Sequence, residues 1–335
     1  MGTRPCFSAV KWQAVSLLLC LFAFNTRLKA DIPPFADRLC SISDLLNDDP
    51  LGDIASLNVP LKRAGRLFLI EAKVDDQTGN FVFDTGATGL VLNSTYFRKY
   101  TNYEKSAAAG SIVGTSSAIK RIVISQIEIG ALKYKNIEAD LADLGHIENR
   151  RGVKILGLFG LNMIDNFEVI FDARNNQLQL YLVDKEGNRI DRKKSDQEFD
   201  YTQKLDLHKK IMLLQGQVGD KQLNFCLDTG AETNVIDSQL PKKVLNTIKI
   251  NRSSNLQGAN AGNVEVLYGT MSELKLGEKQ LGQMETIVTS LERMSEAYDC
   301  TIDGMLGYDF WRKGIFCINF GKGTISFSLW KGENQ

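Results

Sequence analysis

The stretch GRLFLIEAKVDDQTGNFVFDTGATGLVLNS, residues 65–94, decides the fold, because it recurs without a gap as KKIMLLQGQVGDKQLNFCLDTGAETNVIDS, residues 209–238. Each copy has a short apolar run, then Asp-Thr-Gly, then alanine. At average residue usage, one such tripeptide occurs by chance in roughly one chain of this length in ten or twenty. Two in matching contexts indicate a duplicated segment in which each half contributes one aspartate, Asp84 and Asp228.

The repeat continues beyond this block. Residues 111–141 match 260–290 in character, as a glycine-bearing hairpin followed by alternating strands, and residues 158–181 match 305–328. The pattern predicts an all-β chain of two lobes, closed and barrel-like, related by a pseudo-twofold axis. We place the lobes at residues 60–183 and 205–335, joined by a charged, solvated linker over 184–204.

The N-terminus carries a predicted signal peptide over residues 1–30. Arg4 and Lys11 precede about eleven apolar residues, 14–24, too few for the roughly twenty needed to span a bilayer. We therefore expect an exported protein, periplasmic or extracellular, with no stable membrane span after signal cleavage.

Residues 31–59 lie outside the repeat and form a predicted N-terminal extension. Apolar residues recur there at helical spacing, which predicts a short helix packed on a lobe; they are Leu39, Ile42, Leu45 and Leu46. An inhibitory pro-segment is the alternative, although the extension is rich in aspartate, which a carboxylate site would repel.

Composition narrows the function further. The whole chain has 40 basic and 40 acidic side chains, and residues 1–30 hold four of the basic and none of the acidic ones. The mature chain is thus mildly acidic with no basic stripe, which argues against nucleic-acid binding. His146 and His208 are the only histidines, and the cysteines match no metal-binding spacing, so no metal or cofactor is expected.

Four cysteines remain after signal removal, Cys40, Cys226, Cys300 and Cys317. A disulfide is compatible with export, and Cys300 with Cys317 is the first pair to test because both flank the second apolar-apolar-Gly element. Free buried thiols fit the sequence equally well.

The paired loops suggest a specific chemistry. Two carboxylates that meet across a pseudo-twofold axis cannot both ionise easily, because like charge and desolvation oppose it, so Asp84 and Asp228 would share one proton. The ionised member can accept a proton from a water while the protonated member donates to a carbonyl oxygen. This arrangement hydrolyses amides without a metal or a covalent intermediate.

The residues beside the aspartates have supporting roles in this scheme. The hydroxyls of Thr85 and Thr229 should tie each loop to the backbone of the other, since a buried hydroxyl needs a partner. Gly86 and Gly230 should allow a backbone geometry that other residues resist.

These motifs resemble the aspartic proteases, and the retropepsin branch more than the pepsin branch. The resemblance rests on the strand-DTG-Ala loops, the glycine hairpins, and Leu-Phe-Gly at 158–160 with Met-Leu-Gly at 305–307, and it covers residues 60–181 and 205–329. It implies an aspartic endopeptidase acting on a peptide or protein, with Asp84 and Asp228 catalytic. Because both copies lie in one chain, we expect a monomer.

The resemblance also implies substrate-binding residues, which include the two that follow each DTG motif: Ala87, Thr88, Ala231 and Glu232. Flaps are expected near the hairpin glycines, which are Gly110, Gly114, Gly258 and Gly262. An extended peptide would lie between flaps and aspartates, held by strand-like hydrogen bonds.

Departures from the family pattern concern the residues after each DTG. Pepsins place Ser or Thr there, whereas this chain has Ala87 and Ala231, which favours a less acidic pH optimum. Retropepsins often carry an acidic residue next, which holds the substrate backbone; Glu232 could do so, and Thr88 only weakly. The two ends of the cleft should therefore differ.

A non-catalytic periplasmic peptide-binding or sensory protein with the same fold remains the alternative. Such a protein would be free to lose one aspartate, and this chain retains both.

Overall fold

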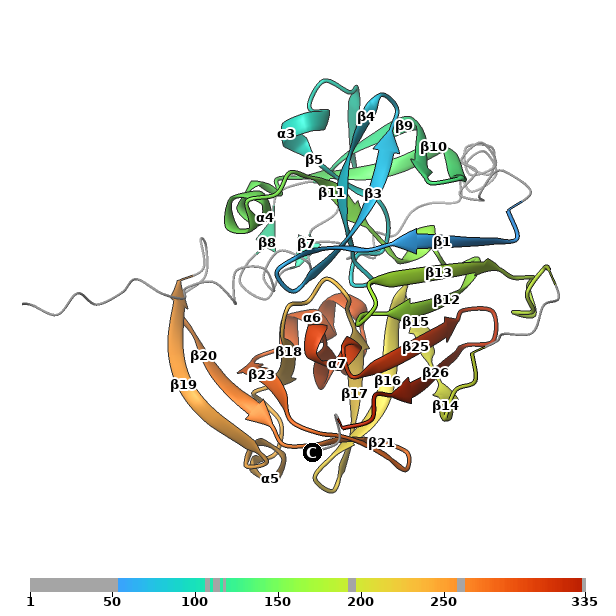
Figure 1. Cartoon of the computed structure of the whole chain (residues 1–335). Coiled ribbons are helices and arrows are strands. Elements are labelled where there is room, and N and C mark those ends of the chain that lie inside the picture. The colour runs from blue at the N-terminus through green and yellow to red at the C-terminus, as the bar shows by residue number, and fades with distance from the viewer. Residues whose placement is uncertain are drawn as a thin grey trace, which may run out of the picture.

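The computed structural model describes residues 54–105, 109–110, 115–116, 119–191, 197–257 and 263–332. It is a β protein of two lobes with a sheet between them (Figure 1). The predicted signal peptide and the predicted helix in the extension lie outside the described residues. Within the described ranges, no helix has the length and apolar character needed to cross a membrane.

The first lobe is a barrel. Its eight-stranded sheet has the order β2-β3-β4-β11-β5-β10-β9-β6, and a further β3–β9 pairing closes six of these strands into a ring. The strands are β2 (Lys62–Ala64), β3 (Leu67–Val74), β4 (Gln77–Phe83), β5 (Val91–Asn93), β6 (Asn102–Lys105), β9 (Ile119–Ile129), β10 (Leu132–Ala142) and β11 (Ile155–Phe159). Short elements complete it: α3 (Ser94–Phe97), α4 (Gly145–Arg151), the 3-10 helix η2 (Leu161–Met163), and the paired β7 (Ala109–Gly110) and β8 (Thr115–Ser116).

The second lobe repeats this plan in a more open form. Its sheet runs β19-β20-β23-β18-β24-β17-β16-β21-β22, with β15 beside β16. These strands are β15 (Asp206–His208), β16 (Ile211–Val218), β17 (Lys221–Leu227), β18 (Asn234–Asp237), β19 (Ile248–Gln257), β20 (Asn263–Met271), β21 (Leu274–Leu276), β22 (Lys279–Leu281), β23 (Met284–Thr289) and β24 (Gly304–Leu306). Its helices are α5 (Lys242–Leu245), α6 (Glu292–Tyr298) and α7 (Tyr308–Trp311).

The two lobes differ in their long hairpin, which is continuous in the first lobe as β9–β10. In the second lobe this hairpin is interrupted after Met271, so that β20 pairs with β23 while β21 and β22 form a separate short pair. The second sheet therefore curls around its core without the ring of hydrogen bonds that closes the first.

A six-stranded sheet joins the lobes, in the order β1-β13-β12-β25-β26-β14. Its strands are β1 (Ser56–Pro60), β12 (Phe167–Asp172), β13 (Gln177–Leu182), β14 (Tyr201–Lys204), β25 (Gly314–Asn319) and β26 (Thr324–Leu329). β12 of the first lobe pairs antiparallel with β25 of the second, with Ile170 opposite Cys317. The two edge strands come from segments that were predicted to lie outside the lobes. β1 falls almost entirely in the predicted extension, and β14 falls in the predicted linker.

One apolar core runs through both lobes. Phe171 on β12 packs edge-on against Phe68 on β3 and against Trp311 on α7, with ring centroids 4.8 and 5.5 Å apart. Trp311 is fully buried and belongs to this core. Cys226, Cys300 and Cys317 are free thiols, so the Cys300–Cys317 disulfide is not formed: Cys317 is buried within β25, whereas Cys300 follows α6.

Candidate active site

Each aspartate stands at the end of a buried strand. β4 delivers Asp84 and β17 delivers Asp228, and the apolar side chains of these strands fix both ends inside the lobes. The backbone N–H of Asp84 donates to the carbonyl of Phe159 at 3.0 Å, and that of Asp228 donates to the carbonyl of Leu306 at 3.0 Å. Each DTG loop therefore begins at the equivalent position beside its neighbouring parallel strand, which is β11 for the first loop and β24 for the second.

The apolar-apolar-Gly elements hold the far side of each loop. The N–H of Leu161 donates to the Ala87 carbonyl at 2.8 Å, and the N–H of Tyr308 donates to the Ala231 carbonyl at 2.9 Å. Gly160 lies so close to this loop that a Cβ there would stand 2.2 Å from the carbonyl oxygen of Gly89. Glycine is required here because the two backbones touch.

The threonines link the two loops symmetrically. The hydroxyl of Thr85 donates to the Leu227 carbonyl and accepts from the N–H of Thr229, at 3.2 and 3.0 Å. The hydroxyl of Thr229 donates to the Phe83 carbonyl and accepts from the N–H of Thr85, at 2.7 and 3.0 Å. These four buried hydrogen bonds are the cross-loop ties expected from the sequence.

Glycine is required in the two DTG motifs for a different reason from the one that the sequence suggested. Neither Gly86 nor Gly230 has a positive φ, so unusual backbone geometry is not what selects them. A Cβ on Gly86 would stand 2.6 Å from the carboxyl carbon of Asp228, and a Cβ on Gly230 would stand 2.6 Å from that of Asp84. The glycines are needed because each aspartate lies against the opposite loop.

The two carboxyl groups form one buried unit. Both aspartates are fully buried, and each carboxyl group lies against the loop that carries the other. Burial and the neighbouring charge of Asp228 raise the pKa of Asp84 well above its usual range. Burial also raises the pKa of Asp228, although hydrogen bonds from backbone N–H groups oppose the rise. The pair therefore favours one shared proton.

Oδ1 of each aspartate is held by the backbone. Oδ1 of Asp84 accepts from the N–H groups of Gly86 and Ala87, at 2.9 and 3.2 Å, and Oδ1 of Asp228 accepts from the N–H of Gly230 at 2.8 Å. In the described ranges, no group hydrogen-bonds to Oδ2 of either aspartate. The Oδ2 atoms are therefore the ones left for a water or a substrate.

The alanines after each DTG pack inward. Ala87 and Ala231 are buried, each in an apolar cluster between its loop and the helix beside it, α4 or α6. Their side chains therefore support the loop rather than offer a surface to a peptide. Thr88 is half-buried, and its carbonyl accepts from the N–H of Asn162 at 3.1 Å.

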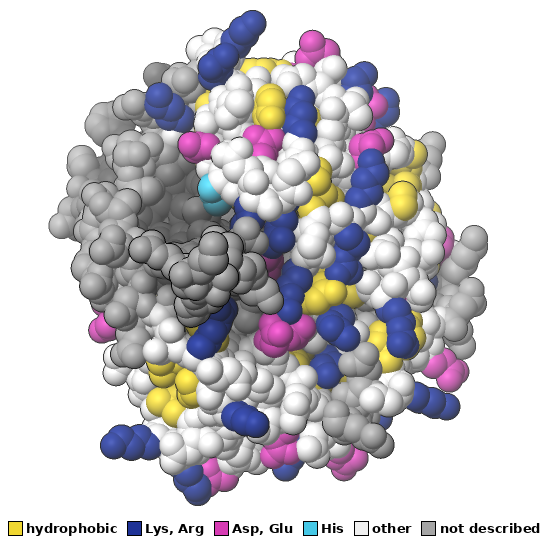
Figure 2. All heavy atoms as spheres, turned by 60° about the vertical axis from the view of Figure 1, so that its left-hand side comes forward, with side chains coloured by type: hydrophobic (Ala, Val, Ile, Leu, Met, Phe, Trp, Pro, Cys, Tyr) yellow, Lys and Arg dark blue, Asp and Glu magenta, His cyan; other side chains and the backbone are white. Residues whose placement is uncertain are grey.

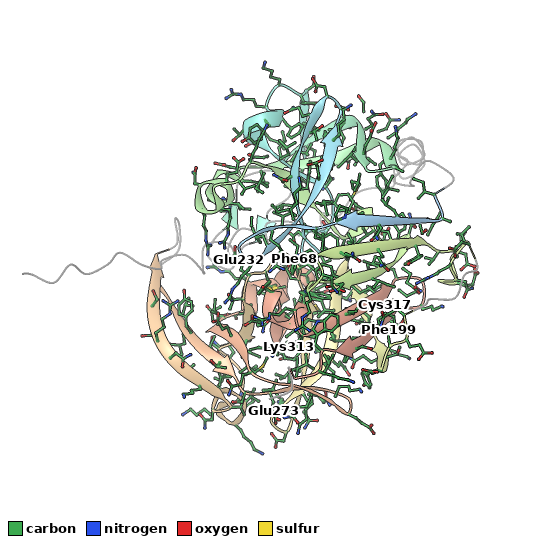
Figure 3. All side chains as sticks on the ribbon, viewed as in Figure 1. Phe68, Phe199, Glu232, Glu273, Lys313 and Cys317 are labelled. Carbon is green, nitrogen blue, oxygen red and sulfur yellow. The ribbon has the colours of Figure 1, made fainter. Side chains whose placement is uncertain are left out.

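Glu232 makes contacts that its sequence position alone does not reveal. Its buried carboxylate pairs with Arg150, at 3.4 Å, and with Arg151, both at the end of α4 in the other lobe. Arg66 donates to the Glu232 carbonyl at 3.2 Å. Figure 3 shows Glu232 at the boundary between the lobes. A comparison of the two halves could have pointed to these arginines, because the corresponding residues of α6, Ala297 and Tyr298, carry no charge.

Of the predicted flap residues, the structure describes only Gly110. It pairs with Thr115 in the short β7–β8 ladder, and β7 lies against α6 of the other lobe. This hairpin therefore reaches across the lobe boundary. Gly114, Gly258 and Gly262 lie outside the described residues.

No group of three or more His, Cys, Asp or Glu side chains in the described ranges is placed to hold a metal ion. The family model for aspartyl proteases matches the chain twice, over residues 70–163 and 214–310, and the two segments together cover more than half of it. No curated protein matched the chain.

Proposed function

Because the chain belongs to the aspartyl protease family, we propose that it is an aspartic endopeptidase in which Asp84 and Asp228 activate one water between them. The observation that carries this proposal is the buried pair of closely opposed carboxyl groups, held in place by the Thr85–Thr229 ties. Two carboxyl groups that share a proton provide an acid and a base at one place.

The two aspartates supply an acid and a base together. The protonated aspartate donates the shared proton to the carbonyl oxygen of the scissile peptide bond. The ionised aspartate accepts a proton from the water as the water oxygen attacks the carbonyl carbon. The tetrahedral intermediate then collapses as the C–N bond breaks: the proton taken from the water passes to the leaving amine, and a hydroxyl group of the intermediate returns a proton to the other aspartate as the new carboxyl group forms.

This mechanism requires that a water and a peptide reach the aspartate pair. Both aspartates are fully buried, so a water and a peptide can reach them only in a conformation with a wider cleft. The strand edges beside the loops would bind the peptide backbone by adding it as an extended strand.

We further propose that the protein acts outside the cytoplasm as a monomer. Residues 1–30 support export through their basic start and short apolar run. The presence of both aspartates in one chain supports a complete site within a single copy.

Cleavage of a diverse peptide library by the mature chain, followed by mass spectrometry across acid to neutral pH, tests the function. Asp84→Asn and Asp228→Asn should each lower kcat by about a thousandfold or more, because either change abolishes the shared-proton arrangement. Asp206→Asn, an exposed aspartate on β15, is the control and should retain full activity.

Two results would oppose the proposal. Near-complete activity in either dyad variant would show that the pair is not the catalyst. Saturable peptide binding without any cleavage would favour the non-catalytic peptide-binding alternative.

A further inference from the structure

A hollow of about 610 Å³ lies at the lobe boundary beside the second DTG loop. Glu232 and Thr233, which follow that loop directly, form part of its wall, and β19, β20 and β23 form another part. Neither Asp84 nor Asp228 lines it, so it is one end of the cleft rather than its centre.

Basic side chains dominate this hollow. Four arginines line it against two glutamates, and these residues are Arg66, Arg150, Arg151, Arg252, Glu232 and Glu285. Both glutamates are already engaged, Glu285 by Arg66 at 2.7 Å and Glu232 by Arg150 and Arg151. The hollow therefore keeps an excess of positive charge.

Two features show that the hollow has polar groups left for a ligand. Arg252 on β19 stacks on the ring of Tyr268 with its guanidinium carbon 3.9 Å from the ring centroid, and no acidic side chain in the described ranges pairs with it. Nε of Arg151, a donor, is buried without a hydrogen-bond partner. Buried polar atoms without partners are costly unless a ligand or water satisfies them.

Among the described residues, the positions that correspond to Glu232, Arg150 and Arg151 carry no charge. The caps of α4 and α6 superpose in conformation, with Leu144 and Leu291 before each helix and a left-handed residue after it, so Arg150 and Arg151 correspond to Ala297 and Tyr298. Glu232 corresponds to Thr88. The pseudo-symmetric frame thus carries the Glu232–Arg150–Arg151 cluster at one end only.

The basic surface extends beyond this hollow. A second hollow of about 490 Å³ shares Gly65 with the first and is lined by Arg63, Arg174 and Arg312, with no acidic side chain. Figure 2 shows Lys and Arg side chains gathered across the middle of this face. A ligand leaving the first hollow on this side would meet further positive charge.

We propose that this end of the cleft selects substrates with a carboxylate, from an Asp or Glu side chain or from a peptide C-terminus, in the hollow lined by Arg66, Arg151 and Arg252. The proposal rests on the proposed function, since it assumes that the cleft holds a peptide. Planar guanidinium groups bind carboxylates through paired, charge-assisted hydrogen bonds.

The test compares peptides that differ by one charge. In a cleavable peptide, Glu replaces Gln at each position on both sides of the scissile bond, and each peptide is made with a free and an amidated C-terminus. We expect kcat/KM to rise about tenfold for Glu at positions on one side only, as expected for one charge-assisted contact. Preference for the free C-terminus instead of for Glu would identify the terminal carboxylate as the bound group.

Arg252→Gln should reduce this preference severalfold, and Arg252→Glu should reverse it in favour of Lys at the same position. Arg252 is exposed on β19, so these variants leave the buried ion pairs intact. Arg293→Gln, on the corresponding helix α6 at the other end, is the matched control and should leave the preference unchanged.

Binding of the same peptides to the Asp84→Asn chain, measured by fluorescence anisotropy, separates this proposal from the proposed function. Tighter binding of the carboxylate peptides that depends on Arg252 supports the proposal even if the wild-type chain cleaves nothing. Equal binding and equal kcat/KM for the Glu and Gln peptides at every position would overturn it.

Discussion

The side chains that follow the two DTG motifs bear on the proton affinity of the aspartate pair. Ala87 and Ala231 offer no hydroxyl, and Oδ2 of each aspartate has no hydrogen-bond donor among the described residues. Burial raises the pKa of both aspartates, and no such donor lowers it at Oδ2. The proposed mechanism requires one proton on the pair, so both limbs of its pH profile should lie above those of a pair with extra donors.

The first prediction is that Ala87→Ser with Ala231→Ser moves the bell-shaped profile of kcat/KM toward acid. A hydroxyl that donates to a carboxylate stabilises the ionised form, which lowers the pKa of the pair, so both limbs should fall by about one pH unit. Ala64→Ser changes the same apolar cluster as Ala87→Ser without adjoining an aspartate and should leave the profile in place. A profile that stays put in the double variant, or moves toward alkali, would contradict this account.

At the scale of elements, the two DTG loops act as one unit. Each loop is short and begins at a strand end, so its own backbone offers few hydrogen bonds. The loops satisfy their buried polar groups by exchange, with each threonine bonded to the other loop. The position of one aspartate therefore depends on the loop that carries the other.

The second prediction concerns this exchange. Thr85→Val keeps the side-chain shape but leaves the Leu227 carbonyl and the Thr229 N–H buried without partners. We expect the free energy of unfolding in urea to fall by about 2–4 kcal/mol, and kcat to fall as the loops separate. Thr78→Val, on the exposed side of β4, should change stability little. Equal stability of both variants would show that the ties do not hold the loops.

Across the whole molecule, the lobes are not separable bodies. The central sheet takes strands from both halves, and Phe171 contacts Phe68 in one lobe and Trp311 in the other. Because the core is continuous, loss of packing in one lobe exposes apolar surface in the other. A shared core keeps the two aspartates in register although they lie far apart in the sequence.

The third prediction is that the chain unfolds as a single unit. Phe171→Ala should lower the free energy of unfolding by about 3–5 kcal/mol, and far-UV circular dichroism and tryptophan fluorescence should report the same midpoint. Phe97→Ala, buried within the first lobe, should shift the tryptophan signal, to which Trp311 and Trp330 in the second half contribute, together with the circular dichroism. Separate midpoints for the two probes would show that the lobes unfold independently.

The repeated pattern was enough to predict the β fold, the two lobes and the meeting of Asp84 with Asp228. This succeeded because strand alternation and turn residues are local signals, and because a duplicated segment folds twice into the same shape. The symmetry of the duplication then brings equivalent loops together. Even the threonine ties follow, since a buried hydroxyl must find a partner across the axis.

Other features depended on distance in space, and only the folded chain decided them. The sequence suggested that Gly86 tolerates special backbone geometry, but the approach of Asp228 is what excludes a side chain there. No local sequence signal predicts the ion pair between Glu232 and Arg151, because the two residues belong to different lobes and 80 residues of chain lie between them. Differences between the halves are tertiary for the same reason: each half folds by the common pattern, while charges that match across the interface depend on which surfaces meet.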